Sequence, residues 1–129
     1  MFAFKKEYFF IITNINDINL NHIKRYNKFN IIFRNQNKNV DLDKVKKFRN
    51  KCKLKKIKFF VANDVPRAVF LKADGIYISS YNRNLGYLGL VNLGFSLIGS
   101  AHNYKEIYQK KNQGCCKIIV SRLFKVDNK

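Results

Sequence analysis

"VANDVPRAVFLKADGIYIS", residues 61–79, contains a strand, a helix and a second strand in one short stretch. It begins on the end of the apolar run IKFFVA (57–62) and finishes on the apolar run GIYIS (75–79). Between them, Asp64 is a residue type that caps helix N-termini, and Pro66 suits the first helical turn. Short, continuously apolar strands are typical of parallel sheets, whose two faces are both covered. The stretch therefore predicts a β–α–β unit.

The same alternation continues on both sides of this unit. Four further apolar runs occupy residues 8–13, 29–34, 95–100 and 116–121. Segments with helical patterns or capping residues separate most of the six runs. Strand and helix alternating at about 20 to 25 residues predict a parallel sheet with crossover helices.

Three segments between the runs have features of helices. A lysine-rich segment, residues 44–58, follows Asp41 and Asp43, and acids at that position favour the helix dipole. Asn103 and Glu106 have the spacing of a capping pair before another helix. The residues expected to face inward are Leu42, Val45, Phe48 and Cys52 in the lysine-rich segment, and Ile18, Ile23 and Tyr26 in a segment that Asp17 opens.

Polar residues at the ends of the apolar runs decide between two parallel-sheet architectures. A doubly wound sheet gathers such residues at one switch point, whereas a (β/α) barrel brings the ends of all its strands to one mouth. Here every run is followed by polar residues: Thr13 and Asn14, Arg34 and Asn35, Asn63 and Asp64, Ser79 and Ser80, Ser100 and His102, Ser121 and Arg122. We therefore expect an α/β fold of the TIM-barrel type.

Length and composition are those of one folded domain without a membrane span. The chain has 129 residues, of which 47% are hydrophobic and 15% aromatic. No apolar run approaches the roughly 20 residues that cross a bilayer. The N-terminal apolar run is short and lacks a small-residue cleavage site, so we interpret it as a first strand and expect a cytoplasmic protein. Cys52, Cys115 and Cys116 are expected to be reduced, mostly buried thiols.

The formal net charge of +18 has two interpretations. Lysines and arginines neutralise the phosphates of nucleic acids. However, the basic residues are spread along the chain, no nucleic-acid-binding signature is present, and the abundant Lys, Asn, Ile and Phe are the residues that an A- and T-rich genome produces. We favour a solvated helix face and expect no nucleic-acid partner.

The motifs resemble those of a known family. "ANDVPRAVFLKADGIYIS" (62–79), "LIGSAHN" (97–103) and "LFKVDNK" (123–129) together resemble, in order and spacing, the thiamine-phosphate synthase and TenI family. The resemblance runs from about residue 9 to residue 129, so residues 1–129 are expected to form one domain of this type. It implies a TIM barrel that joins hydroxymethylpyrimidine diphosphate to thiazole phosphate and releases pyrophosphate.

The resemblance also assigns residues and a cofactor. Arg34, Asn63, Ser100 and Lys129 match the residues that bind the substrates and the pyrophosphate, and Asp64 matches a metal-binding aspartate. The second metal aspartate of the family falls on Asn82, which brings no charge. The implied Mg²⁺ site is therefore weakened, since hard cations prefer carboxylate ligands. The implied ligands are a phosphorylated pyrimidine and a phosphorylated thiazole.

Length separates this chain from the family pattern. A TIM barrel has eight strands, and the sequence contains six apolar runs. About six of eight βα units are thus expected, with two exposed sheet edges. A C-terminally shortened product, or a homo-oligomer that completes the sheet, would account for this.

Several of these residues also have a simpler structural interpretation. Asp64 is either only a helix cap or also a metal or pyrophosphate ligand, and Arg34 either forms an ion pair at the barrel mouth or binds phosphate. His102 either hydrogen-bonds its own loop or acts as an acid or base. Asp74 precedes a strand, at the opposite end of the sheet from Asp64, and is expected to shape the turn with Gly75. The alternative function is a degenerate TenI-like protein that binds thiazole or thiamine phosphate, or a tautomerase, without coupling activity.

Overall fold

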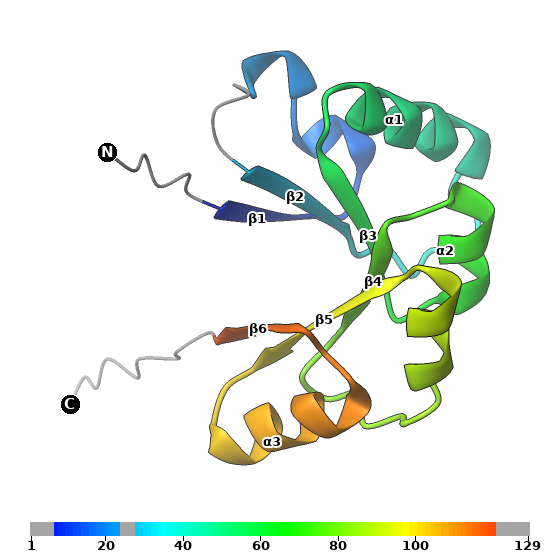
Figure 1. The fold of residues 1–129 in the computed structure, drawn as a ribbon. Coiled ribbons are helices and arrows are strands. Elements are labelled where there is room, and N and C mark those ends of the chain that lie inside the picture. Colours follow the sequence, from blue (N-terminus) through cyan, green and yellow to red (C-terminus); the bar gives the residue numbers. More distant parts are fainter. Residues whose placement is uncertain (1–6, 24–27, 121–129) are drawn as a thin grey trace, which may run out of the picture.

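Six parallel strands form one curled sheet in the computed structural model, which describes residues 7–23 and 28–120 (Figure 1). The strands are β1 (Glu7–Ile12), β2 (Lys28–Phe33), β3 (Lys58–Ala62), β4 (Gly75–Ile78), β5 (Ser96–Ala101) and β6 (Lys117–Val120). All six predicted runs are therefore strands. Their order across the sheet is β1-β2-β3-β4-β5-β6, so each strand lies beside its predecessor in the chain.

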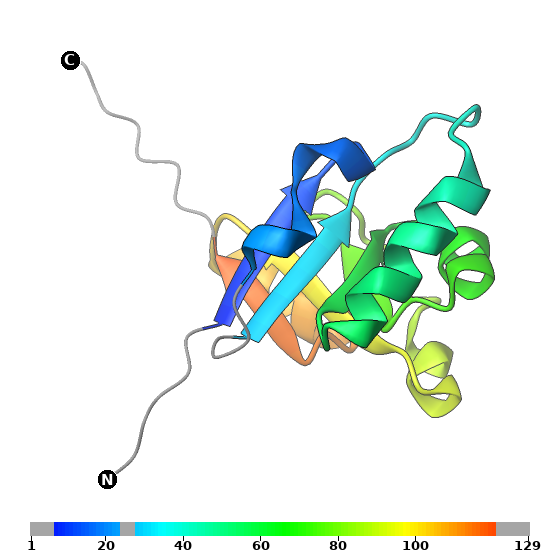
Figure 2. The same cartoon turned by 90° about the horizontal axis from the view of Figure 1, so that it is seen from above.

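This sequential order distinguishes the two architectures. A doubly wound sheet reverses its strand order at a switch point, and no reversal occurs among the six strands that the structure describes. The helices lie outside the curl, along its convex face (Figures 1 and 2). The fold is a curled parallel half-barrel of the TIM type, as the polar ends of the runs predicted.

The helices begin and end at residues whose chemistry explains them. α1 (Leu42–Leu54) is capped by Asp41, whose side chain accepts from the backbone N–H groups of Asp43 and Lys44. α2 (Val65–Leu71) is capped by Asp64 and α3 (Tyr104–Gln113) by Asn103. A 3₁₀ segment, η3 (Leu88–Leu93), takes the place of a helix between β4 and β5. The caps predicted at Asp64 and Asn103 are confirmed, whereas Asp41, predicted as an acid of the first turn, is itself the cap of α1.

The segment after β1 differs from the expectation. Asp17 does not open an α-helix, because two short 3₁₀ turns, η1 (Ile15–Asp17) and η2 (Leu20–His22), occupy this connection. The side chains of Asn14 and Asn19 accept from backbone N–H groups two residues onward, at 3.0 and 2.9 Å. Such local bonds compete with helix formation. Ile18 and Ile23 still pack against the core as predicted, and Tyr26 lies outside the described residues.

Two apolar layers cover the two faces of the sheet. The larger layer fills the space between the convex face and the helices and includes Ile31, Phe59, Ile76 and Leu97. From α1 it receives Val45, Phe48 and Cys52, as predicted. Leu42, also predicted to face inward, is only half-buried, and the lysines of the opposite helix face are exposed. The smaller layer lines the concave face and consists of Ile32, Phe60, Tyr77 and Ile98, with Phe9, Ala62 and Ile119 packed against it.

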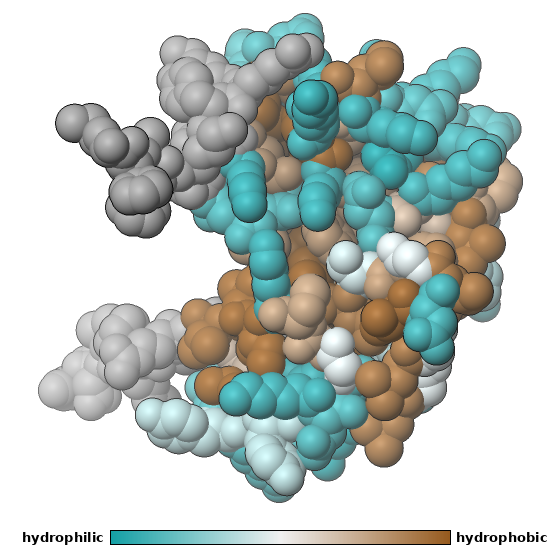
Figure 3. Space-filling view, in the orientation of Figure 1, coloured by the Kyte–Doolittle hydropathy of each residue, from teal (hydrophilic) through white to brown (hydrophobic). Residues whose placement is uncertain are grey.

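The two edge strands of the sheet, β1 and β6, are connected by side chains. The ammonium group of Lys117 in β6 donates to both carboxylate oxygens of Glu7 in β1, at 2.9 and 2.7 Å. The side-chain amide of Asn30 donates to the same carboxylate at 3.0 Å. The space-filling view shows a hollow that opens between these edges, and hydrophilic surface over α1 (Figure 3).

The cysteines are free thiols with different exposure. Cys52 is buried, Cys115 is half-buried and Cys116 is exposed. Burial raises the pKa of the Cys52 thiol to about 12 and that of Cys115 to about 11. Within residues 7–23 and 28–120, no cluster of three or more His, Cys, Asp or Glu side chains is placed to hold a metal ion. Among the same residues, no helix has the length and apolar character of a membrane span.

Candidate functional site

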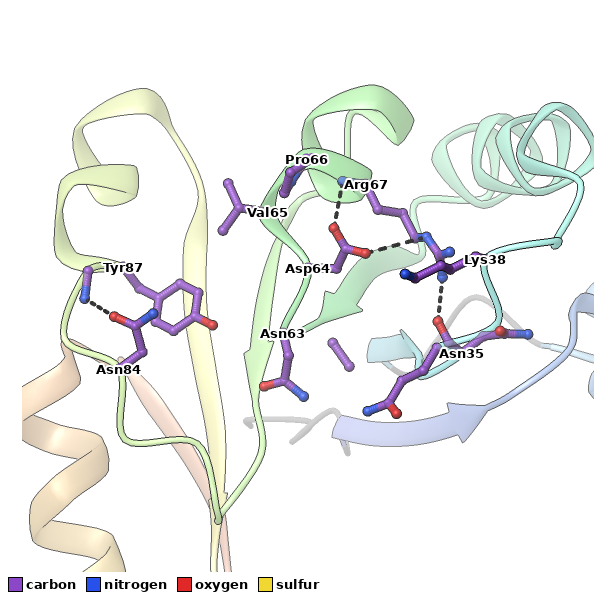
Figure 4. A pocket seen from close by; sticks show the side chains of 12 residues that line it. Asn35, Lys38, Asn63, Asp64, Val65, Pro66, Arg67, Asn84 and Tyr87 are labelled. Atoms are coloured by element: carbon purple, nitrogen blue, oxygen red, sulfur yellow. Dashed lines mark hydrogen bonds and ion pairs between the residues drawn. The ribbon is translucent and has the colours of Figure 1, made fainter.

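The carboxyl ends of β2, β3 and β4 surround an open cleft of about 470 Å³ (Figure 4). Because the strands are parallel, the loops that follow them lie at the same edge of the sheet, where (β/α) barrels bind their ligands. The residues that line the cleft are Asn35, Gln36, Lys38, Ala62, Asn63, Asp64, Val65, Pro66, Arg67, Asn84, Gly86 and Tyr87. Its charged groups are thus two cations and one carboxylate.

Asn63 connects the loop after β3 to the loop after β4. Its backbone has a φ of 58°, in the left-handed region that asparagine tolerates better than most residues. Its side-chain oxygen accepts from the backbone N–H of Ser79 at 3.0 Å, and its amide nitrogen donates to the Ser79 hydroxyl at 2.8 Å. Asn63, predicted as a ligand-binding residue, therefore uses its side chain to hold the floor of the cleft.

Asn82 lies next to Asn63, with its amide nitrogen toward the cleft wall. That nitrogen donates to the side-chain oxygen of Asn63 at 2.9 Å and to the Tyr87 hydroxyl at 2.8 Å. The side-chain oxygen of Asn82 accepts from the backbone N–H of Asn84 at 3.0 Å. The side chain of Asn82 therefore positions Tyr87 and the loop around it.

A buried lysine and a buried glutamine from α3 support this loop from below. The ammonium group of Lys110 donates to the carbonyl oxygen of Asn82 at 2.8 Å and to the Gln113 side chain at 2.7 Å. The amide of Gln113 donates to the carbonyl oxygens of Asn82 and Asn84, both at 2.8 Å. Burial lowers the pKa of Lys110. Neither residue was expected from the sequence to have a role near the site.

Asp64 caps α2 and pairs with an arginine of the same turn. One carboxylate oxygen accepts from the backbone N–H of Arg67 at 3.0 Å, and the other lies 3.7 Å from Nε of Arg67. The Asp64 side chain is 45% exposed and the Arg67 side chain 9%. The guanidinium group also donates to the carbonyl oxygens of Asn35 and Asn37, the latter at 3.0 Å. The capping role of Asp64 is confirmed, and its carboxylate faces a cation of this chain.

The donor set at Asp64 and Asn82 does not fit the Mg²⁺ ion that the resemblance implies. Mg²⁺ binds oxygen ligands, commonly one or two carboxylates with water and substrate phosphates. Both oxygens of Asp64 are engaged by Arg67. The oxygen of Asn82 is engaged by a backbone N–H, and its amide hydrogens point at Asn63 and Tyr87. A metal ion here would share the Asp64 carboxylate with the Arg67 guanidinium and would need the Asn82 amide to turn.

Two other predicted site residues, Arg34 and Ser100, lie away from the cleft lining. Arg34 follows β2, where its backbone N–H donates to the carbonyl oxygen of Ile12 at 2.8 Å, and its side chain is exposed. Ser100 lies in β5, nearly buried, opposite Ile119 of β6. Lys129 lies outside the described residues. Of the predicted site, the structure brings together Asn63, Asp64 and Asn82.

His102 forms a local contact at the end of β5. Its Nδ1 lies 3.0 Å from a carboxylate oxygen of Glu106, which also accepts from the backbone N–H of His102 at 2.7 Å. That backbone bond is the main reason why the pKa of Glu106 lies below its ordinary value. Both residues lie outside the cleft lining. The observed contacts of His102 are those of the loop-bonding alternative.

Lys38, Arg67, Asn84 and Tyr87 also line the cleft, and the sequence did not predict a role for them. One signal was available for Arg67, because a basic residue three positions after a capping aspartate is close enough to pair with it. Lys38, Asn84 and Tyr87 lie in loops without regular spacing, and no local pattern indicates where their side chains point.

Comparison with known proteins gives a fold-level match. No family model and no curated protein sequence matches this chain. A solved structure, the thiamine phosphate pyrophosphorylase from Pyrococcus furiosus, matches with a TM-score of 0.64 and 15% sequence identity. The match covers 92% of this chain and 61% of that enzyme. At this identity the match shows the fold alone, and the chain spans less than two thirds of the enzyme it resembles.

Proposed function

We propose that the cleft binds the phosphorylated pyrimidine and thiazole compounds from which thiamine phosphate is made. Residues 1–129 would then form a domain of the thiamine-phosphate synthase and TenI type. The observation that supports this best is the place of the cleft: it is built around Asn63 and Asp64, at the carboxyl end of β3. The half-barrel fold shared with a thiamine phosphate pyrophosphorylase adds support.

The charge of the cleft is consistent with a phosphorylated ligand. Lys38 and Arg67 line it opposite a single carboxylate, Asp64. Lys38 is an exposed residue of the lining, so its ammonium group is accessible to an anion. A cationic, half-open pocket of this size is suited to a small phosphate ester.

The first candidate activity is the coupling reaction of a thiamine-phosphate synthase. Hydroxymethylpyrimidine diphosphate and thiazole phosphate would react to give thiamine phosphate and pyrophosphate. The fold match with a thiamine phosphate pyrophosphorylase favours this candidate. The cationic cleft would stabilise the negative charge of the departing pyrophosphate.

The second candidate is binding of thiazole phosphate or thiamine phosphate without coupling. The pairing of Asp64 with Arg67 favours it, because a metal ion in a coupling site would have to share this carboxylate with a guanidinium. Arg34 and Ser100 remain proposed contacts for the far end of a ligand that extends over the concave face.

One set of assays tests the proposal and separates the two candidates. Calorimetric titration of the protein with thiamine phosphate should show saturable binding. Lys38→Met should weaken it about tenfold, as expected for loss of one charge-assisted contact. Lys51→Met, on the exposed face of α1, removes the same charge elsewhere and should leave it unchanged.

Turnover then distinguishes the candidates. Release of pyrophosphate from the two phosphorylated substrates would establish the transferase, whereas binding without release would establish the second candidate. The absence of binding by thiamine phosphate and by both substrates would contradict the proposed function altogether.

A further inference from the structure

Arg67 is held in place beside Asp64 by three separate contacts. Its guanidinium donates to the carbonyl oxygens of Asn35 and Asn37 in the loop after β2, and its Nε lies 3.7 Å from Asp64. The side chain is 9% exposed. Moving it away from Asp64 would leave two loop carbonyls without these donors, so the pair is a fixed part of the fold. Arginine also stays protonated at any physiological pH.

A divalent cation and this guanidinium compete for the same carboxylate. One oxygen of Asp64 caps the N-terminal turn of α2, and the other faces Arg67. A cation bound to the second oxygen would lie close to the guanidinium, in a partly buried site where repulsion between like charges is weakly screened. Asn82 offers no compensation, because its amide nitrogen donates to Asn63 and Tyr87 and its side-chain oxygen accepts from the backbone N–H of Asn84.

We propose that Arg67 is a permanent internal cation for Asp64, and that the cleft therefore holds its anionic ligand without a divalent metal ion. The ligand half of this statement rests on the proposed function, whereas the metal half rests only on the contacts of Arg67. In the ligand half, Lys38 and the edge of the Arg67 guanidinium supply the positive charge that a metal ion would otherwise provide.

The metal half is tested with Mn²⁺ alone, whose binding is read from the loss of the free-ion signal in electron paramagnetic resonance. The wild-type protein should leave the signal unchanged. Arg67→Met keeps the apolar stem but frees Asp64, and should bind Mn²⁺ at least about tenfold more tightly than the wild type. Arg67→Met/Asp64→Asn should lose that gain, which assigns it to the carboxylate.

Two outcomes would overturn the metal half. One is Mn²⁺ binding by the wild type that Asp64→Asn abolishes, a result that needs no Arg67 variant to fold. The other is a folded Arg67→Met protein, verified by circular dichroism, with no gain in Mn²⁺ binding, because Arg67 would then not be what excludes the metal.

The ligand half is tested with inorganic phosphate, titrated in EDTA and again in excess Mg²⁺. The two dissociation constants should agree within about twofold. Binding that requires Mg²⁺ would overturn this half while leaving the proposed function intact. An absence of binding under both conditions would overturn the ligand half and count against the proposed function, and the Mn²⁺ result would still stand.

Discussion

Two arginine–aspartate pairs flank α2 at opposite ends of the sheet. Arg49 pairs with Asp74 at 3.4 Å, at the amino end of β4, and Arg67 pairs with Asp64 at 3.7 Å, at the carboxyl end of β3. Both arginine side chains are nearly buried, and both aspartates are partly exposed. The chemistry of the two pairs is the same, but the groups that surround them differ.

The amino-end pair is connected mainly to the backbone of the sheet. Asp74 accepts from the N–H of Phe59 through its side chain at 2.8 Å, and its carbonyl oxygen accepts from the N–H of Ser96 at 3.0 Å. Arg49 donates from Nε to the carbonyl oxygen of Lys72 at 3.0 Å. The start of β3, the end of α2 and the start of β5 are thereby held together. The role of Asp74 is structural, as its position before a strand predicted.

The carboxyl-end pair is connected to loops that border a cleft. Here the arginine binds the loop carbonyls, and the aspartate is left facing the opening. The location of such a pair in a barrel, more than its residue types, decides whether it stabilises the fold or borders a cleft.

Asp74→Ala should lower the free energy of unfolding by about 3 kcal/mol, because it leaves the buried charge of Arg49 without its counter-ion and the N–H of Phe59 without an acceptor. Urea denaturation measures this loss. Labelling of the buried Cys52 thiol, which lies near both residues, should become faster, while exposed Cys116 reacts at its usual rate. Thiamine phosphate should still bind to the folded fraction.

Asp74→Asn is the matched control for this variant. The amide oxygen still accepts from Phe59, so about half of the lost stability should return. If Asp74→Ala changes stability by less than about 0.5 kcal/mol, as typical surface substitutions do, the structural role of the amino-end pair is wrong.

Lys110→Met should lower the free energy of unfolding by about 2 kcal/mol and loosen the loop that carries Asn82 and Tyr87. It removes a buried donor from the Asn82 carbonyl and from Gln113 without removing any cleft-lining side chain. Hydrogen exchange should speed up at the N–H of Asn82 and Asn84, while the N–H of Asp74 remains protected. Equally faster exchange at Asn82, Asn84 and Asp74 would contradict the claim that the carboxyl and amino ends of the sheet are stabilised independently.

Asp64→Ala should lower the free energy of unfolding by only about 1 kcal/mol, the usual effect of losing a helix N-cap. Because its partner Arg67 keeps two carbonyl acceptors, no buried charge is left without partners. Thermal unfolding of Asp64→Ala and Asp74→Ala side by side measures the ratio of the two effects. Equal losses would mean that both aspartates are structural.

Lys117→Met, at the open edges of the half-barrel, should lower the free energy of unfolding by about 0.5 kcal/mol. The effect is small because the ion pair with Glu7 is partly exposed. The hydrogen bond from Lys117 is the main cause that lowers the pKa of Glu7 below its ordinary value of 4.5. A lowered folded-state pKa stabilises the protein above pH 4.5, and this contribution disappears as the pH falls through the folded-state pKa. The difference in free energy of unfolding between the wild type and Lys117→Met should therefore shrink as the pH is lowered. A difference that does not change with pH would exclude the ion pair with Glu7 as its cause.

The fold and part of the site follow from local patterns in the sequence. Apolar runs and polar residues at their ends predicted six parallel strands and a barrel-type sheet, and the capping role of Asp64 follows from the proline two residues onward. These features depend on residues a few positions apart, where spacing determines geometry.

The remaining features depend on contacts between distant segments. Arg67 reaches carbonyl groups some thirty residues earlier in the chain. Lys110 looks like a surface lysine in its helix, but a Cβ atom at Gly99 would lie 2.7 Å from its side chain, so the glycine leaves room for it. The spacing of residues in the sequence does not predict this packing of Lys110 against Gly99. The two residues come together only when the sheet has formed.

The most direct test of the difference between the two ends is an amide NMR titration of the wild-type protein with thiamine phosphate in EDTA. Chemical-shift changes are expected at residues 35–38, 62–67 and 84–87 around the cleft, with none at the amino-end residues Phe59, Asp74 and Ser96. Changes centred on the amino end, or no changes at saturating ligand, would contradict the assignment of Asp64 and Arg67 to a ligand site.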